Sequence, residues 1–115
     1  MISKLTNIVV KASEFKDELK KKKDDETVIY TVHWDLDHKP SLDEAQDIVG
    51  GYVQIVHSPK LYDKGEEIKQ ILVNEEGLIY GFKGNTIASA MANMPLVGNA
   101  LILEGEHMWD SRSYP

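Results

Sequence analysis

The apolar run A-L-I-L at residues 100–103 constrains the fold more than any other stretch of this chain. Four consecutive apolar residues with no polar residue between them predict a strand that is buried on both faces. A strand of that kind is typical of the interior of a sheet. The chain has 115 residues, enough for one domain with a single hydrophobic core around such a strand.

Five other segments carry strand patterns, and they are residues 7–11, 28–37, 52–57, 66–73 and 78–82. Residues 28–37 alternate between apolar and polar side chains, so we expect one face of that strand on the core and the other toward water. The last two segments are joined by N-E-E-G, which predicts a tight hairpin with Glu75 and Glu76 at an exposed tip. Gly77 would then occupy the turn position that requires a positive φ.

Capping residues mark two helices. Ser41, with Glu44 three residues later, is a capping-box pattern ahead of an apolar stripe, and Gly50 supplies a left-handed stop. Ser13 is expected to cap a helix over residues 13–23, whose lysines gather toward the C-terminal end.

Helical and strand patterns are mingled along the chain, and a third helix is expected over residues 86–93. Several strands nevertheless follow one another through short turns, which favours an α+β fold. We predict a single domain with a mixed or mostly antiparallel sheet of about five strands and two to three helices, all on one face of the sheet.

Composition argues against several classes of function. The absence of cysteine excludes disulfides, thiolate catalysis and the commonest structural zinc sites. A net charge of −6 disfavours nucleic acid as a partner, because its binders normally present a basic face. No apolar run approaches the roughly 20 residues that span a bilayer, and the N-terminus lacks the apolar core of a secretory signal. We therefore expect a soluble protein of the cytoplasm with no membrane partner.

One cluster of potential metal ligands, H-W-D-L-D-H, occupies residues 33–38. The strand alternation would place His33, Asp35 and Asp37 on one outward face, and imidazole and carboxylate groups bind zinc, iron or manganese. Alternate residues of a strand lie roughly 6.6 Å apart, so the three form a row and not a cage. The pattern favours an exposed strand face, and we expect no metal or other cofactor.

The stretch G-F-K-G-N-T at residues 81–86 follows a strand pattern and opens a helix, as phosphate-binding loops do. It lacks both glycine spacings of such loops, and asparagine is a preferred helix N-cap residue. A helix N-terminus still offers free amides to an anion. The candidate ligand-binding residues are therefore Tyr80, Lys83, Gly84, Asn85 and Thr86.

No local pattern indicates catalysis. None of the serines lies in a nucleophile motif. Glu75 and Glu76 are expected in a solvated turn, which lacks the burial that raises the pKa of a general acid. We therefore predict no catalytic residues and a protein that is not an enzyme.

Four motifs follow one another in the second half of the chain: G-G-Y-V-Q-I-V at residues 50–56, V-N-E-E-G-L-I-Y-G-F at 73–82, N-T-I-A-S-A at 85–90 and L-V-G-N-A-L-I-L at 96–103. This arrangement resembles a family of small domains of unknown function that are common in bacteriophage genomes and in prophage-like or mobile regions of bacteria. The resemblance covers residues 41–103. It leaves residues 1–40 as a variable N-terminal part and residues 104–115 as a polar tail. It implies a phage-type accessory protein that acts in the cytoplasm of a bacterial host.

These observations favour a non-enzymatic binding module that acts on a host or phage protein, with a homo-oligomer as a further assembly to consider. Trp109 and Tyr114 are the candidate exposed aromatic anchors of a partner surface. The alternative is a protein that binds or sequesters a small nucleotide-type ligand at the residues named above. A metal-dependent enzyme that uses His33, Asp35 and Asp37 ranks last.

Overall fold

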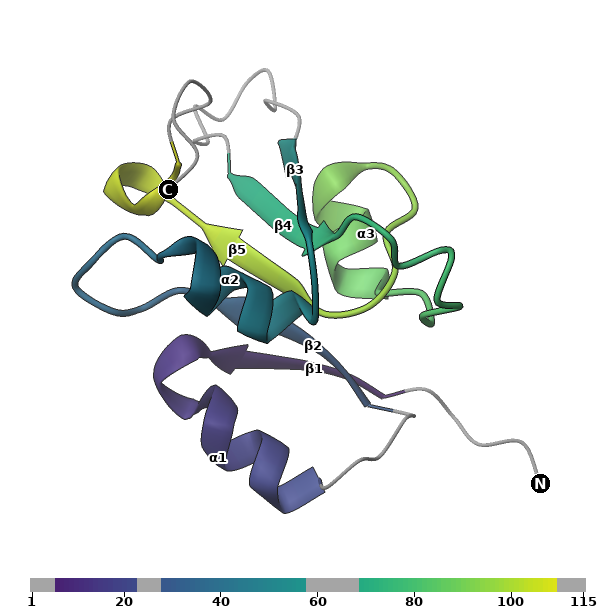
Figure 1. Cartoon of the computed structure of the whole chain (residues 1–115), viewed down its shortest axis with the longest axis horizontal. Coiled ribbons are helices and arrows are strands. Elements are labelled where there is room, and N and C mark those ends of the chain that lie inside the picture. The colour runs from purple at the N-terminus through teal and green to yellow at the C-terminus, as the bar shows by residue number, and fades with distance from the viewer. Residues whose placement is uncertain (1–5, 23–27, 58–68, 110–115) are drawn as a thin grey trace.

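The computed structural model describes residues 6–22, 28–57 and 69–109. Its elements, labelled in Figure 1, are in chain order β1 (Thr6–Lys11), α1 (Ala12–Lys22), β2 (Val28–His33), α2 (Leu42–Val49), β3 (Val53–His57), β4 (Gln70–Asn74), α3 (Thr86–Ala92), β5 (Ala100–Leu103) and the 3₁₀ helix η1 (Gly105–His107). Residues 66–68, which were expected to begin a strand, lie outside the described ranges.

The strand β5 lies at the centre of the sheet formed by the described strands, which has the order β1-β2-β5-β4-β3. It pairs parallel with β2 and antiparallel with β4. All four of its residues are buried, so the prediction of a central strand at residues 100–103 is confirmed. The predicted α+β class with a mixed sheet is confirmed as well. The strands β1 and β2, from the first forty residues, belong to this same sheet.

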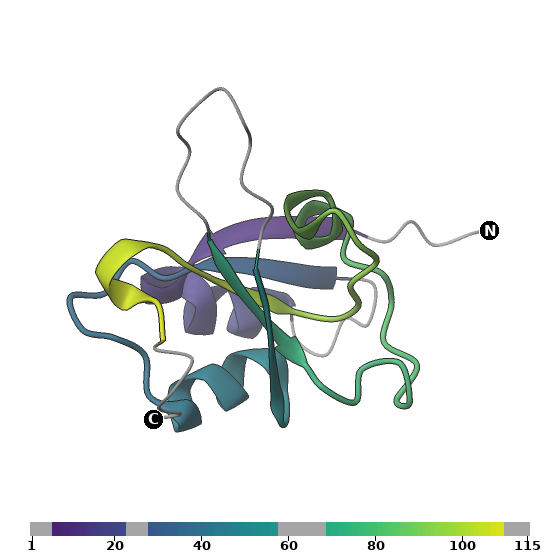
Figure 2. The same ribbon diagram turned by 90° about the horizontal axis from the view of Figure 1, so that it is seen from above.

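Helices cover both faces of the sheet, and each face carries its own hydrophobic cluster. On one face, Phe15 of α1 and Ile48 of α2 join a cluster with Leu101 of β5. On the other face, Ala88 of α3 packs in a cluster with Ile102 of β5. Figure 2 shows α1 and α2 on one side of the strands and α3 on the other. The expectation of helices on one face only is wrong, because the central strand buries apolar side chains in both directions.

The strand β2 departs from the alternation expected for residues 28–37. Residues 29–32 are all buried, because β1 and β5 flank this strand and helices lie over both faces of the sheet. The strand also ends early, at His33. Beyond it the chain turns, and the indole Nε1 of Trp34 donates a hydrogen bond of 2.6 Å to the backbone carbonyl of His38. Asp35 and Asp37 therefore lie in a connection and not on a strand.

The helix α2 has the capping box that the sequence predicts. The Ser41 hydroxyl accepts a hydrogen bond of 3.1 Å from the backbone N–H of Glu44. The Glu44 carboxylate in turn accepts one of 2.9 Å from the backbone N–H of Ser41. Gly50 ends the helix in the left-handed conformation with a φ of 83°. Both local signals are confirmed because each acts within the helix end itself.

The helix α1 begins in a different way from the one expected. It begins at Ala12, so Ser13 lies inside its first turn and is not its N-cap. The backbone N–H and the hydroxyl of Ser13 donate to the two carboxylate oxygens of Asp35, at 3.0 and 2.6 Å. The Ser13 hydroxyl lowers the pKa of the Asp35 carboxyl below its ordinary value. A side chain from the connection after β2 thus satisfies the start of α1.

His38 extends the capping box at the start of α2. Its ring Nε2 lies 3.0 Å from a carboxylate oxygen of Glu44. This hydrogen bond raises the pKa of His38 above its ordinary value. The backbone N–H of Ser41, followed by the His38 ring, lowers the pKa of the Glu44 carboxyl. The charged forms of both side chains are therefore favoured in the folded state.

Replacing His38 with Gln removes this charged partner and should make stability less dependent on pH. Because folding raises the pKa of His38, its contribution is full below the ordinary pKa of the ring and is lost as the pH rises through the raised value. Because folding lowers the pKa of Glu44, that contribution is lost as the pH falls through the lowered value. We expect wild type and His38→Gln to differ most at about pH 5.5 and to converge by about pH 9 in urea unfolding. A difference that stays constant across this range would contradict the assignment.

Candidate binding site

The segment after β4 forms successive turns and not the expected second strand of a hairpin. The backbone N–H of Tyr80 donates to the carbonyl of Glu76, and that of Phe82 donates to the carbonyl of Gly77, at 3.0 and 2.9 Å. These local hydrogen bonds occupy the groups that a strand at residues 78–82 would use. The side chain of Asn74 starts the turn, because its oxygen accepts a hydrogen bond of 2.8 Å from the backbone N–H of Glu76.

Gly77 is needed for close packing and not for a positive φ. Positive φ among the glycines is confined, within the described residues, to positions 50, 81, 98 and 105. A Cβ atom at Gly77 would lie 2.8 Å from a methyl group of Val97. The predicted role of Gly77 was therefore wrong, since the constraint comes from a segment twenty residues further along the chain. Glu75 is exposed, as expected, and Glu76 is half-buried.

This loop presents large apolar side chains to solvent. Leu78, Ile79 and Tyr80 are 83, 80 and 62% exposed, and Tyr52, just before β3, is 65% exposed. Tyr52 and Tyr80 line a common hollow of about 160 Å³ together with Glu76, so the two segments adjoin. We refer to Tyr52, Leu78, Ile79 and Tyr80 as the apolar loop surface. Large apolar side chains that are exposed in one loop, with acidic residues beside them, are typical of an interaction site.

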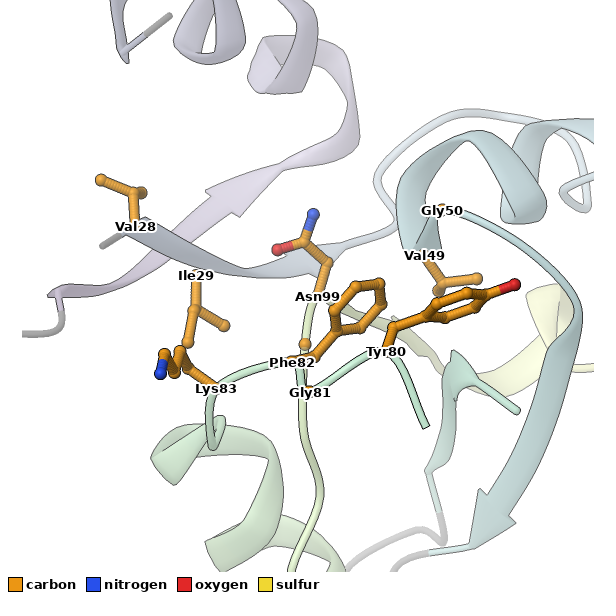
Figure 3. A pocket seen from close by; sticks show the side chains of 10 residues that line it. Val28, Ile29, Val49, Gly50, Tyr80, Gly81, Phe82, Lys83 and Asn99 are labelled. Carbon is orange, nitrogen blue, oxygen red and sulfur yellow. The ribbon is translucent and has the colours of Figure 1, made fainter. Parts of the chain in front are cut away.

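Tyr80 also lines a pocket of about 420 Å³ (Figure 3). Its walls come from the start of β2, the C-terminal end of α2, the loop itself and the residues just before β5. The side chains that line it include Val28, Ile29, Val49, Tyr80, Phe82, Lys83 and Asn99. The rings of Tyr80 and Phe82 are stacked, with centroids 5.7 Å apart and an interplanar angle of 29°. Of the predicted ligand-binding residues, Tyr80 and Lys83 line this pocket.

Asn85 is committed to the fold and does not offer a free amide. Its backbone N–H donates to the carbonyl of Leu96 at 2.8 Å, and its side chain is fully buried. The side-chain oxygen accepts hydrogen bonds of 3.0 Å from the Thr31 hydroxyl and from the backbone N–H of Ala88. The predicted N-cap role is therefore confirmed, whereas the expected open amide at Asn85 is wrong. Gly84 and Thr86 are exposed but do not line the pocket of about 420 Å³.

The aromatic anchor expected at Trp109 is buried. Its exposed fraction is 3%, and its indole Nε1 donates to the carbonyl of Pro40 at 2.9 Å. The buried side chain of Gln70 holds its backbone, with one hydrogen bond to the carbonyl and one from the N–H, both 2.6 Å. Trp109 therefore stabilises the core and does not form part of an exposed partner surface. Tyr114, the second expected anchor, lies outside the described residues.

The histidine and aspartate row expected at residues 33–38 does not form. His33 ends β2, Asp35 is bonded to Ser13, and Asp37 lies in the connection beyond. Within residues 6–22, 28–57 and 69–109, no three histidine, aspartate or glutamate side chains gather in a geometry suited to a metal ion. Asp35 instead stabilises the fold through its contact with Ser13 at the start of α1.

Sequence reasoning missed the pocket residues from remote segments. The sequence alternation places Ile29 on the face expected mostly toward water, Val49 belongs to the expected buried stripe of a helix, and Asn99 enters only within the motif at residues 96–103. The side-chain oxygen of Asn99 accepts a hydrogen bond from the backbone N–H of Tyr30, and its amide donates to the carbonyl of Ile48, at 2.9 and 3.2 Å. The sequence signal for this role of Asn99 is its position as a polar residue directly before the fully apolar strand at residues 100–103.

Comparisons of the chain with models of known protein families, with curated proteins and with solved structures found no match. Within the part of the chain that the structure describes, no helix has the length and apolar character needed to cross a bilayer.

Replacing Asn85 with Ala should strongly destabilise the fold. The change leaves the Thr31 hydroxyl, the Ala88 N–H and two backbone carbonyls without their buried partner. We expect a loss of about 3 kcal/mol in the free energy of unfolding, measured by urea denaturation. Gln54→Ala, at an exposed position of β3, should change it by less than about 0.5 kcal/mol. Equal effects of the two substitutions would show that Asn85 has no special role.

Replacing Gly98 with Ala should disturb the wall of the pocket. Gly98 has a φ of 78°, and a Cβ there would lie 2.7 Å from the ring of Phe82. We expect a loss of about 1–3 kcal/mol in the free energy of unfolding. Gly84→Ala is the matched control, because its φ is not positive and its Cβ would meet no atom within 4 Å. Thermal unfolding of both variants tests this, and a neutral Gly98→Ala would refute it.

Proposed function

We propose that this protein is a non-enzymatic binding module whose apolar loop surface docks onto a partner protein. The observation that carries the proposal is the exposure of Leu78 and Ile79, at 83 and 80%, in a loop that its own hydrogen bonds hold in place. Folded proteins rarely leave neighbouring large aliphatic side chains in water without a use for them. We further propose that the protein is of phage type. Its partner would be a host or phage protein in the cytoplasm of the bacterial host.

The free energy gained by burying these side chains is sufficient for the centre of a protein–protein interface of moderate size. Burying one such side chain contributes about 1.5–3 kcal/mol. Four residues would together supply a gain comparable with the cost of about 4–15 kcal/mol for association itself. The apolar loop surface is therefore suited to be the dry centre of an interface, with polar contacts around it.

The charge around this surface favours a basic partner. Glu75 is exposed next to it, and Glu76 lines the hollow between Tyr52 and Tyr80. The whole chain carries a net charge of −6, which would speed the approach of a basic protein and repel an acidic one. Association should accordingly slow as the salt concentration rises, while the apolar contact persists.

Capture from a bacterial host lysate tests the proposal. The immobilised protein should retain a specific partner that a Leu78→Ser and Ile79→Ser double variant does not, because the variant removes the centre of the apolar loop surface. We expect at least a tenfold loss of captured protein, quantified by mass spectrometry at several salt concentrations, which corresponds to about 1.4 kcal/mol or more.

A matched control is Val9→Thr, which alters another exposed apolar side chain, at 51%, on the edge strand β1. This variant should capture the partner as well as the wild type does. Equal capture by all three proteins, or capture by none above background, would contradict the proposal. Light scattering on the purified protein checks for self-association. A dimer that the double variant abolishes would assign the surface to a second copy and not to a host or phage protein.

A further inference from the structure

Tyr80, which belongs to the apolar loop surface, also borders a pocket with features of a small-molecule site. Its volume of about 420 Å³ lies within the range of about 300–1,000 Å³ usual for ligand pockets. It lies where the parallel strands β2 and β5 begin and where α2 ends. Three elements that are distant in sequence therefore meet around one concave surface.

Its walls are fixed by hydrogen bonds and close packing. Asn99 connects the start of β2 to the end of α2 through its bonds to Tyr30 and Ile48. The carbonyl of Lys83 accepts a hydrogen bond of 2.8 Å from the backbone N–H of Gly98, which holds the loop against the residues before β5. A ligand entering such a pocket would pay little for ordering the protein.

The lining combines an aromatic wall, an apolar floor and one cation. Ile29 and Val49 supply the floor, and the stacked rings of Tyr80 and Phe82 form the wall. Figure 3 shows the Lys83 side chain beside Ile29, away from Tyr80. Among the described residues that line the pocket, Lys83 is the one that carries a charge, and none is acidic. Although the whole chain has a net charge of −6, the described lining of this pocket therefore favours an anion.

We propose that this pocket binds a small anion with a planar base, of the nucleoside monophosphate class. The planar base lies against the ring pair of Tyr80 and Phe82, where stacking and apolar contact stabilise it. The phosphate lies at the ammonium group of Lys83, which bonds it as a point charge. The amide of Asn85 is not part of this site, because it is bonded to Leu96.

Titration of the isotope-labelled protein with adenosine 5′-monophosphate tests the site, with adenosine and inorganic phosphate as separate probes. We expect saturable amide shifts at Ile29, Phe82, Lys83 and Asn99. The nucleotide should bind about tenfold more tightly than either fragment, because each fragment makes only one of the two contacts. Phosphate that binds as tightly as the nucleotide would overturn the stacking contact. Shifts confined to other parts of the chain would overturn the site.

Two substitutions and a control variant distinguish the contact with the phosphate from the contact with the base. Lys83→Gln should weaken binding of the nucleotide about tenfold while leaving adenosine unchanged. Tyr80→Ala, at a position 62% exposed, should weaken both about tenfold without unfolding the chain. Lys39→Gln removes the same charge at an exposed position beyond the opposite end of β2 and should change neither. Unchanged affinity in Lys83→Gln, or an equal loss in Lys39→Gln, would overturn the proposal.

The protein-docking function is tested independently of this site. Leu78 and Ile79 do not line the pocket of about 420 Å³, so their replacement should leave the nucleotide titration unaltered. Loss of partner capture with intact nucleotide binding would thus distinguish failure of one function from failure of the other.

Discussion

The side chain of Asn85 makes the contacts on which the arrangement of the structure depends most. Its oxygen accepts from Thr31 and from the first turn of α3, and its amide donates to the carbonyls of Tyr30 and Gly98 at 3.3 and 3.0 Å. One buried amide therefore uses its donors and acceptors to join a helix, a strand and the connection before β5. Because the group is fully buried, each of these bonds forms without competition from water. The position of Gly98, and hence of Phe82 in the pocket wall, follows from it.

The parts of the fold that the sequence predicted well are those determined within a few residues. Ser41 and Glu44 bond to each other, Gly50 adopts its left-handed conformation at the end of the same helix, and Asn85 caps the helix that follows it. The apolar run at residues 100–103 also specified its own burial. Each of these signals combines a residue type with a local geometry, so it holds whatever the rest of the chain does.

The parts that could not be predicted depend on contacts between remote segments. Asp35 meets Ser13 over a separation of 22 residues, and no local pattern records that meeting. The segment at residues 78–82 has a strand-like composition, but the side chain of Asn74 and the methyl groups of Val97 dictate a turn there. Trp109 was expected at the surface because it lies in a polar tail, whereas its indole bonds to Pro40 and its backbone to Gln70, 69 and 39 residues away. The candidate site likewise depends on contacts between remote segments. Tyr80 and Lys83 could be singled out from their own stretch, but the floor and the Asn99 contacts come from elsewhere in the chain.

The central position of β5 also has a consequence for how the chain folds. β5 is the last of the described strands in sequence, yet it separates β2 from β4 in the sheet. The backbone N–H of Tyr30 meets the side chain of Asn99 across 69 residues, so the two halves of the sheet cannot close until nearly all of the described chain has emerged from the ribosome. Pairings of such long range are slow to form, and the parallel edge of β2 stays uncovered in the meantime. Closure of the sheet should therefore be a late step in folding, and the interval before β5 docks is the period of greatest exposure to aggregation.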